Sequence, residues 1–221
     1  MNINNRPVRR LKGSSSNKIN TADIANAKSN TNNRGFLDRL SIGTRGEYVA
    51  KEFLLKSNYN YIDCTRNSKM LSEAEIRAYE KAEIDLIVES QLDYSQKTVE
   101  VKTFTKIIEK QSHLCIKVST QYIDEEQQVQ RQDDSYLYRT KAEYFFFVCL
   151  ETKNIYSIKV NDLRQYIEDN HDNKENVYYK TFLDNKDEDS RYDRYNKCAY
   201  VNVSDLMKNK LLKKMTKIEV K

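Results

Sequence analysis

The chain has 221 residues, of which 38 are lysine or arginine, 33 are aspartate or glutamate, and 38% are hydrophobic. This length suits one domain with tails, and no apolar run approaches the roughly 20 residues that a membrane-spanning helix needs. Four glycines and one proline also exclude collagen-like and proline-rich architectures. The net charge of +5 is uneven: residues 1–35 carry +6, residues 207–221 carry +5, and the 36–206 body therefore carries −6. The protein is basic only at its ends.

The cysteines indicate a reducing compartment. They are widely spaced, form no C-x-x-C pair and are accompanied by only two histidines, which argues against a structural zinc site. Each lies in an apolar or strand-like stretch, so we expect buried, reduced thiols in an intracellular protein. The N-terminus has no apolar segment typical of a secretory signal. Its arginine, serine and asparagine bias leaves organellar import as an alternative to a cytoplasmic location.

The N-terminal 40 residues differ from the rest of the chain. Residues 1–40 are rich in serine and asparagine and offer almost nothing to bury, so we expect a disordered basic arm. A single domain is expected over residues 41–221. Its first helix is predicted over 44–57, because Thr44 and Glu47 have the spacing of a capping box and an apolar stripe follows them.

Alternating apolar and polar residues predict a series of strands after this helix. They are expected over residues 61–65, 84–88, 98–103, 114–118, 144–150, 155–160 and 198–203. Further helices are expected after Ser72, over 120–132, up to Ile167, and over the basic segment 205–214. This order predicts an α/β fold with a central mixed sheet flanked by helices.

Three charged residues, Asp85, Glu100 and Lys102, lie in two of these predicted strands. Glu100 and Lys102 project from one face because side chains alternate along a strand, and a hairpin of 84–88 with 98–103 would bring Asp85 beside Glu100. Two neighbouring carboxylates repel unless a cation lies between them, and oxygen ligands suit Mg²⁺ or Mn²⁺. A lysine there can hold the attacking water and offset phosphate charge. The set predicts metal-assisted phosphodiester hydrolysis; the alternative is a solvent-facing edge strand.

Asp85 and the later Val-Glu100-Val-Lys102-Thr segment resemble the PD-(D/E)XK nuclease superfamily, which includes many restriction enzymes and the archaeal-type Holliday-junction resolvases. The resemblance implies a restriction-endonuclease-like fold in which Asp85 and Glu100 bind Mg²⁺ or Mn²⁺. It also implies that the Val101 carbonyl adds a metal ligand and that Lys102 positions the nucleophilic water.

The resemblance extends to the first helix and has departures elsewhere. In that family an acid on the first helix often assists the metal site, and Glu47 lies in the matching place, where it would hold a metal-bound water or a second ion. Glu47 also has a purely structural interpretation as the capping-box acid. The proline–aspartate dipeptide of the family name is absent, since Glu83 precedes Ile84. The insert over residues 66–82 is longer than a compact resolvase needs, and we interpret it as a candidate substrate-reading loop.

These observations predict a metal-dependent DNA endonuclease acting on duplex or branched DNA, with RNA as an alternative substrate. Because one such site cuts one strand, cleavage of both strands predicts a homodimer. The basic ends would supply attraction to phosphates that does not depend on sequence. Two alternatives stay open: a non-catalytic nucleic-acid- or protein-binding protein that keeps this fold, and a structural protein in which the motif is coincidental. The second alternative places Asp85 far from Glu100.

Overall fold

The computed structural model describes residues 31–124, 128–185 and 193–215, and it divides into one unit up to Leu40 and another from Ser41 onward. Helix α2 (Thr31–Leu55) belongs to both units. It begins at Thr31 and not at Thr44, so residues 31–40 are helical and not disordered. A Thr-x-x-Glu spacing fits a helix interior as well as a helix start, and the residues before Thr44 include leucines and arginine, which favour helix. The rest of the expected basic arm, residues 1–30, lies outside the described residues.

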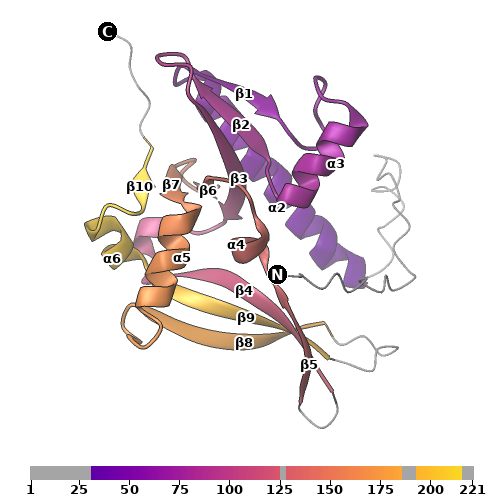
Figure 1. Ribbon diagram of the computed structural model, residues 1–221, viewed down its shortest axis with the longest axis vertical. Helices are drawn as coiled ribbons and strands as arrows, with labels where there is room; N and C mark the ends of the chain where they lie inside the picture. The colour runs from indigo at the N-terminus through magenta and orange to yellow at the C-terminus, as the bar shows by residue number, and fades with distance from the viewer. Residues whose placement is uncertain (1–30, 125–127, 186–192, 216–221) are drawn as a thin grey trace, which may run out of the picture. The chain divides into compact units, whose positions relative to one another are not determined.

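A six-stranded mixed sheet forms the first layer of the second unit, as the sequence predicted (Figure 1). In spatial order its strands are β1 (Tyr59–Asp63), β2 (Leu86–Ser90), β3 (Gln96–Phe104), β6 (Tyr144–Cys149), β7 (Ile155–Lys159) and β10 (Lys213–Lys214). Strands β3 and β6 are parallel, and the other pairs are antiparallel. The predicted hairpin is confirmed, since Leu86 pairs with Val99 and Glu89 with Gln96.

A second, antiparallel sheet was not predicted. Its order is β5 (Val129–Asp134), β4 (His113–Ile123), β9 (Asp193–Asn202) and β8 (Val177–Asn185). The predicted helix over 120–132 is wrong, because β4 continues to Ile123 and the chain returns as β5. Thr120, Tyr122 and Ile123 favour extended backbone, and β4 gains hydrogen-bonded partners on both sides, β5 and β9.

The remaining helices are short. They are α3 (Glu73–Ala82), a 3₁₀ turn η2 (Ile108–Lys110), α4 (Tyr136–Arg139), α5 (Val160–Asp169) and α6 (Val203–Lys208). The capping box of Ser72 and Glu75 starts α3, as predicted. The predicted helix over 205–214 is wrong beyond Lys208: Lys210 has a φ of 59°, Leu212 turns inward to 2% exposure, and Lys213–Lys214 pair with β7. No helix among the described residues is long and apolar enough to cross a membrane.

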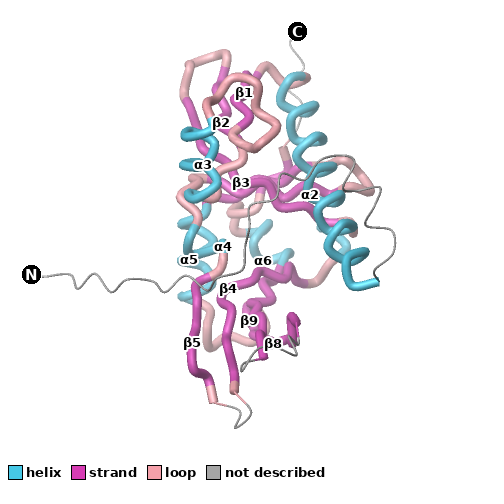
Figure 2. The backbone as a smooth tube through the Cα atoms, turned by 90° about the vertical axis from the view of Figure 1, so that its right-hand side faces the viewer, coloured by secondary structure: helices cyan, strands magenta, loops and turns pink. Residues whose placement is uncertain are grey.

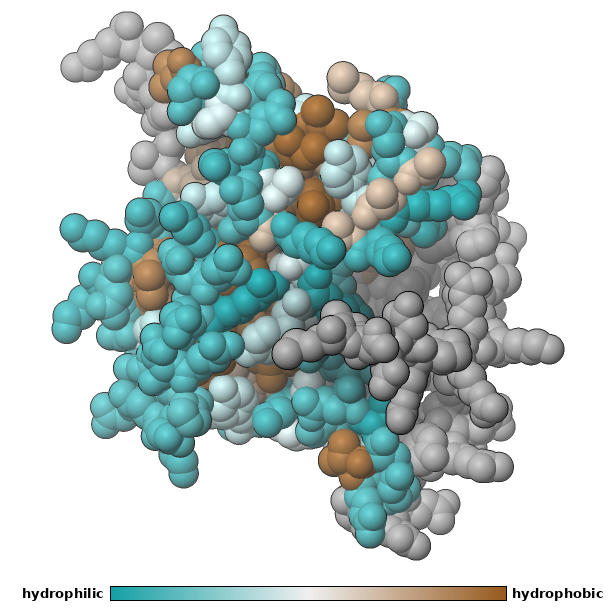
Figure 3. Space-filling model, in the orientation of Figure 1, coloured by the Kyte–Doolittle hydropathy of each residue, from teal (hydrophilic) through white to brown (hydrophobic). Residues whose placement is uncertain are grey.

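Two apolar cores lie on opposite faces of the six-stranded sheet. One, which we call the inter-sheet core, joins this sheet to the second sheet and to α5 and α6 (Figure 2). It includes Leu114, Ile116, Val177, Ala199 and Val201 from the second sheet and Phe145, Phe147, Tyr156 and Ile158 from the first. The other core packs against α2 and includes Val99 and Val101 of β3. The fully buried side chains fill these cores, and the face in Figure 3 is mostly hydrophilic with a few apolar patches.

The cysteines are all free, and three of them are buried as expected. The expectation is wrong for Cys115, which is exposed. Its neighbours Leu114 and Ile116 enter the inter-sheet core, so the alternation of β4 turns Cys115 to the opposite face.

Candidate functional site

Asp85 lies directly before β2 and reaches across to β3. Its backbone N–H donates to the Val99 carbonyl at 2.9 Å, and its Oδ2 accepts the Val101 N–H at 2.7 Å. Because the N–H and C=O of a strand residue point to the same side, the Val101 carbonyl also points toward Asp85. These two bonds hold Asp85 against the part of β3 that contains Glu100, and the charge of Asp85 helps to raise the pKa of Glu100. These contacts with β3 argue against a coincidental motif in which Asp85 lies far from Glu100.

Glu100 is a buried carboxylate with one unpartnered oxygen. It is 3% exposed, and its Oε1 forms an ion pair with Lys102 Nζ. Its Oε2 has no hydrogen-bond partner among the described residues. The nearby Thr140 hydroxyl donates instead to the Glu83 carbonyl at 2.8 Å. Burial raises the pKa of Glu100 to about 7, although the Lys102 charge opposes the shift.

Lys102 lies on the same face of β3 as Glu100, and its side chain keeps 29% exposure. Its Nζ lies 4.2 Å from the ring centroid of Tyr136, a cation–π contact. Buried Ser135 fixes the start of α4, and Tyr136 with it, because its hydroxyl donates to the Lys117 carbonyl and accepts the Leu137 N–H. Lys102 is thus held between an acid and an aromatic ring while still reaching solvent.

Glu47 is placed by a close approach of α2 to β3. A Cβ on Gly46 would lie 2.8 Å from the Cβ and Cγ2 of Thr103, so only glycine lets the helix come this near. Burial, and next the charge of Asp85, raise the pKa of Glu47 to about 7. The charge of Lys102 also acts on Glu47, and Asp85 and Lys102 act on Glu100 as well, so these two residues are electrostatic neighbours of both glutamates.

Two further charged residues belong to this environment and were not predicted. Lys51 Nζ lies 2.6 Å from Asp63 Oδ2 and 3.8 Å from Glu47 Oε2. Burial works to raise the pKa of Asp63, but hydrogen bonds from Lys51 and Thr65 outweigh it and hold that pKa below its usual range. The i, i+4 spacing of Glu47 and Lys51 signals a pair on one helix. No local pattern signals Asp63, which arrives from β1.

The oxygen atoms of the site fit a hard divalent cation that takes only a few of its ligands from the protein. Among residues 31–124, 128–185 and 193–215, no group of three or more His, Cys, Asp or Glu side chains is arranged to hold a metal ion. Mg²⁺, however, is commonly held by one or two carboxylates, with water and substrate oxygens completing its shell. Asp85, the unpartnered oxygen of Glu100 and the Val101 carbonyl supply such a set. The burial of Asp85 raises its pKa despite the Val101 hydrogen bond, and a cation would reverse that shift.

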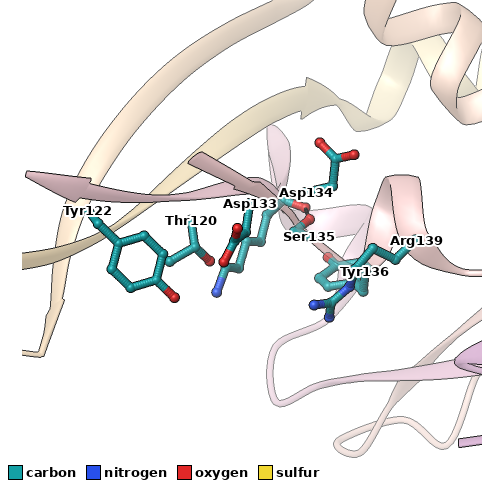
Figure 4. A pocket seen from close by; sticks show the side chains of 8 residues that line it. Thr120, Tyr122, Asp133, Asp134, Ser135, Tyr136 and Arg139 are labelled. Atoms are coloured by element: carbon teal, nitrogen blue, oxygen red, sulfur yellow. Dashed lines mark hydrogen bonds between the residues drawn. The ribbon is translucent and has the colours of Figure 1, made fainter. Parts of the chain in front are cut away.

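A cavity of about 150 Å³ lies next to this site (Figure 4). Its lining comes from β4, β5 and α4: Lys117, Thr120, Tyr122, Asp133, Asp134, Ser135, Tyr136 and Arg139. Tyr136 contacts Lys102 and also lines the cavity, so the cavity and the site share this residue.

Comparisons with family models, with curated proteins and with solved structures found no match to this chain. The interpretation of the site therefore depends on its own geometry and chemistry.

Proposed function

We propose that this protein is a metal-dependent DNA endonuclease that hydrolyses phosphodiester bonds at Asp85, Glu100 and Lys102, with Glu47 beside them. The observation that supports it best is Glu100: a buried carboxylate that feels the charge of Asp85, with one oxygen paired to Lys102 and the other without a partner among the described residues. Buried, mutually repelling acids with raised pKa values are typical of functional sites. The restriction-endonuclease-like assignment of the fold is part of the same proposal.

The chain's own residues have separate roles in the proposed reaction. Asp85 and Glu100 would hold Mg²⁺ or Mn²⁺, with the Val101 carbonyl and Glu47 as further oxygen donors. The cation would supply a Lewis acid that stabilises negative charge on the phosphate. Lys102 would orient the attacking water and reduce the charge on the phosphate oxygens. The water oxygen bonds to phosphorus, the bond from phosphorus to the leaving sugar oxygen breaks, and that oxygen takes up a proton.

The distribution of charge supports a polyanionic substrate. The ends of the chain carry +6 and +5, and positive charge of this kind attracts phosphates without regard to sequence. The body of −6 would repel the same polyanion at long range, so the ends would bring the substrate to it. A homodimer would let two such sites cut both strands of a duplex.

One observation favours a second candidate, a non-catalytic nucleic-acid- or protein-binding protein with this fold. The ion pair of Glu100 with Lys102 neutralises the buried acid without any metal. Such a protein would bind its partner and leave DNA intact.

Cleavage assays separate the two candidates. Plasmid, single-stranded and branched DNA are incubated with Mg²⁺ or Mn²⁺, and the wild type is compared with Asp85→Ala and Lys102→Ala. We expect both variants to lose at least about 100-fold in rate. Lys97→Ala is the matched control, since Lys97 is an exposed lysine of the same strand, paired with Glu143. Unimpaired cleavage by Lys102→Ala would remove Lys102 from the mechanism, and an inactive wild type would favour the binding protein.

A further inference from the structure

The second sheet has one face in the inter-sheet core and one face turned outward. Leu114, Val177 and Val201 enter the core, so the residues that alternate with them point away from it. The outward positions hold aromatic and cationic side chains from all four strands. We call the following residues the outer face: Lys117, Tyr122, Arg131, Tyr178, Lys180, Phe182, Arg194 and Tyr200.

Three rings of the outer face, Tyr178, Tyr200 and Phe182, lie next to one another. Tyr178 and Tyr200, paired across β8 and β9, stack with centroids 4.8 Å apart and an angle of 7° between their planes. Phe182 follows, 6.3 Å from Tyr200, and it is 43% exposed. A phenylalanine that exposed, beside other rings, is a feature of binding surfaces more than of solvated strands.

Cations lie directly against these rings. Lys180 Nζ is 5.5 Å from the centroids of both Tyr178 and Tyr200, and the Arg131 guanidinium is 5.2 Å from the ring of Tyr122. The outward acid Asp133 is paired with Arg131 at 2.7 Å. In a body whose net charge is −6, this places a local excess of positive charge on an aromatic surface.

The cavity of Figure 4 lies at the outer face and shares Tyr136 with the surroundings of Lys102. Lys117 and Tyr122 of the outer face line that cavity, and so does Tyr136, which contacts Lys102. The cavity therefore adjoins both the outer face and a residue that contacts Lys102.

We propose that the outer face binds a single strand of nucleic acid, with bases stacked on Phe182 and its neighbouring tyrosines and phosphates against Lys180 and Arg131. Aromatic platforms interleaved with cations bind single strands without regard to sequence, because every base has a face to stack and every nucleotide has a phosphate. This binding needs no metal and no cleavage, so it stands or fails separately from the endonuclease.

Affinity is measured by fluorescence anisotropy in EDTA, with thymidine and uridine oligonucleotides of about 16 nucleotides and a duplex of equal length. We expect both single strands to bind more tightly than the duplex, and the better of the two identifies DNA or RNA. Phe182→Ala should weaken binding about fivefold or more. Lys180→Ala should weaken it less and reduce the slope of log affinity against log salt by about 0.7.

Matched controls come from the other face of the same strands. Leu183 is 51% exposed and follows Phe182 in β8, and Lys197 of β9 lies 5.1 Å from the ring of Tyr179. Leu183→Ala and Lys197→Ala remove similar side chains from inward positions, so we expect unchanged affinity.

Cys115 provides a measurement that requires no substitution. It lies on the outward side of β4, opposite Tyr200, and it is the exposed one of the four cysteines. A hydrogen bond from Cys198 lowers the pKa of its thiol, which favours alkylation near neutral pH. We expect the oligonucleotide to protect Cys115 from N-ethylmaleimide, scored by mass spectrometry.

The proposal is overturned by any of three results: equal loss of affinity in the outward and inward variants, alkylation of Cys115 that the oligonucleotide leaves unchanged, or no preference for single strands. A dimer that dissociates on Phe182→Ala without oligonucleotide binding would assign the outer face to a second copy of the chain. A Lys102→Ala variant that binds like the wild type but does not cut would support both proposals and show that the two surfaces act separately.

Discussion

The candidate active site and the outer face of the second sheet both hold charged side chains, but in opposite environments. At the site, Glu100 is 3% exposed and burial raises its pKa to about 7. On the outer face, Lys180 is exposed and lies beside two tyrosine rings. A buried charge has a desolvation cost that a bound cation would offset, whereas an exposed cation has little cost and acts through screened attraction. A single substitution should therefore change activity and stability strongly at the site, whereas a single substitution on the outer face should change them only slightly.

Glu100→Gln should have the largest effect on cleavage, and it should change stability in the opposite direction. Glutamine keeps the volume but cannot serve as an anionic ligand, so we expect cleavage to fall by about 100-fold or more. In EDTA at pH 8 the free energy of unfolding should rise by about 1–3 kcal/mol, since the carboxylate with a pKa of about 7 is no longer buried in its ionised form.

Plasmid cleavage and urea denaturation measure the two effects of Glu100→Gln. The control is Glu143→Gln, which alters an exposed glutamate at the end of the same sheet. If Glu100→Gln lost stability together with activity, Glu100 would be a structural anion held by Lys102, and the contrast with the outer face would disappear.

Gly46→Ala should have the next largest effect, a loss of stability, and it tests whether the site depends on the close approach of α2 to β3. The new Cβ would overlap the side chain of Thr103, so either α2 or β3 must shift, at a cost of about 1–3 kcal/mol. Gly43→Ala, with nothing within 4 Å of its Cβ, is the matched control and should stabilise the helix by up to about 1 kcal/mol.

Thermal unfolding of Gly46→Ala and Gly43→Ala measures the difference in stability between the two variants. Adding Thr103→Gly to Gly46→Ala should restore part of the loss. Equal effects of the two alanine substitutions would show that α2 does not depend on close contact at Gly46, and Glu47 would then not be held near the site.

The raised pKa values of Glu47 and Glu100 determine whether stability rises or falls with pH. The pKa values of Glu47 and Glu100 lie at about 7 in the fold and at 4.5 in the unfolded chain, so the fold binds more protons between these values. In EDTA, the contribution of these two groups to stability should therefore be most favourable at and below pH 4.5, fall as the pH rises from 4.5 to about 7, and level off above that. Mg²⁺ competes with protons for the same oxygens and should stabilise more at pH 8 than at pH 5.5.

Denaturation midpoints across pH, with and without Mg²⁺, measure this effect. Glu100→Gln should flatten the curve and reduce the Mg²⁺ response. A Mg²⁺ response that is the same at both pH values, or the same in Glu100→Gln, would contradict metal binding at these carboxylates.

The sequence predicted the parts of the site that depend on local signals. The alternation of residues 84–88 and 98–103 and their short connection predicted the hairpin, and the hairpin brings Asp85 against the part of β3 that contains Glu100. The Ser72 and Glu75 capping box predicted α3 in the same way. Each of these features is encoded within about 20 residues, where periodicity and caps are informative.

The second sheet and its outer face could not be predicted because their pairing is not local. The outer face depends on Tyr178 meeting Tyr200 and on β4 meeting β9, about 80 residues later in the chain. The polar sequence of 120–132 has helical composition, yet the gain from cross-strand pairing outweighs it. Asp63 likewise reaches Lys51 only through the pairing of β1 with β2.

The smallest expected effect is on the stability of the outer-face variants. Lys180 and Phe182 lie on a surface that the inter-sheet core does not need, so Lys180→Ala and Phe182→Ala should change the free energy of unfolding by no more than about 0.5 kcal/mol. Urea denaturation of each variant provides the measurement, with Phe145→Ala, a fully buried core residue, as the destabilising reference. A loss above about 1 kcal/mol in either outer-face variant would mean that the rings and cations stabilise the sheet itself. The aromatic series would then be structural, and only the buried carboxylates would still require a ligand to explain them.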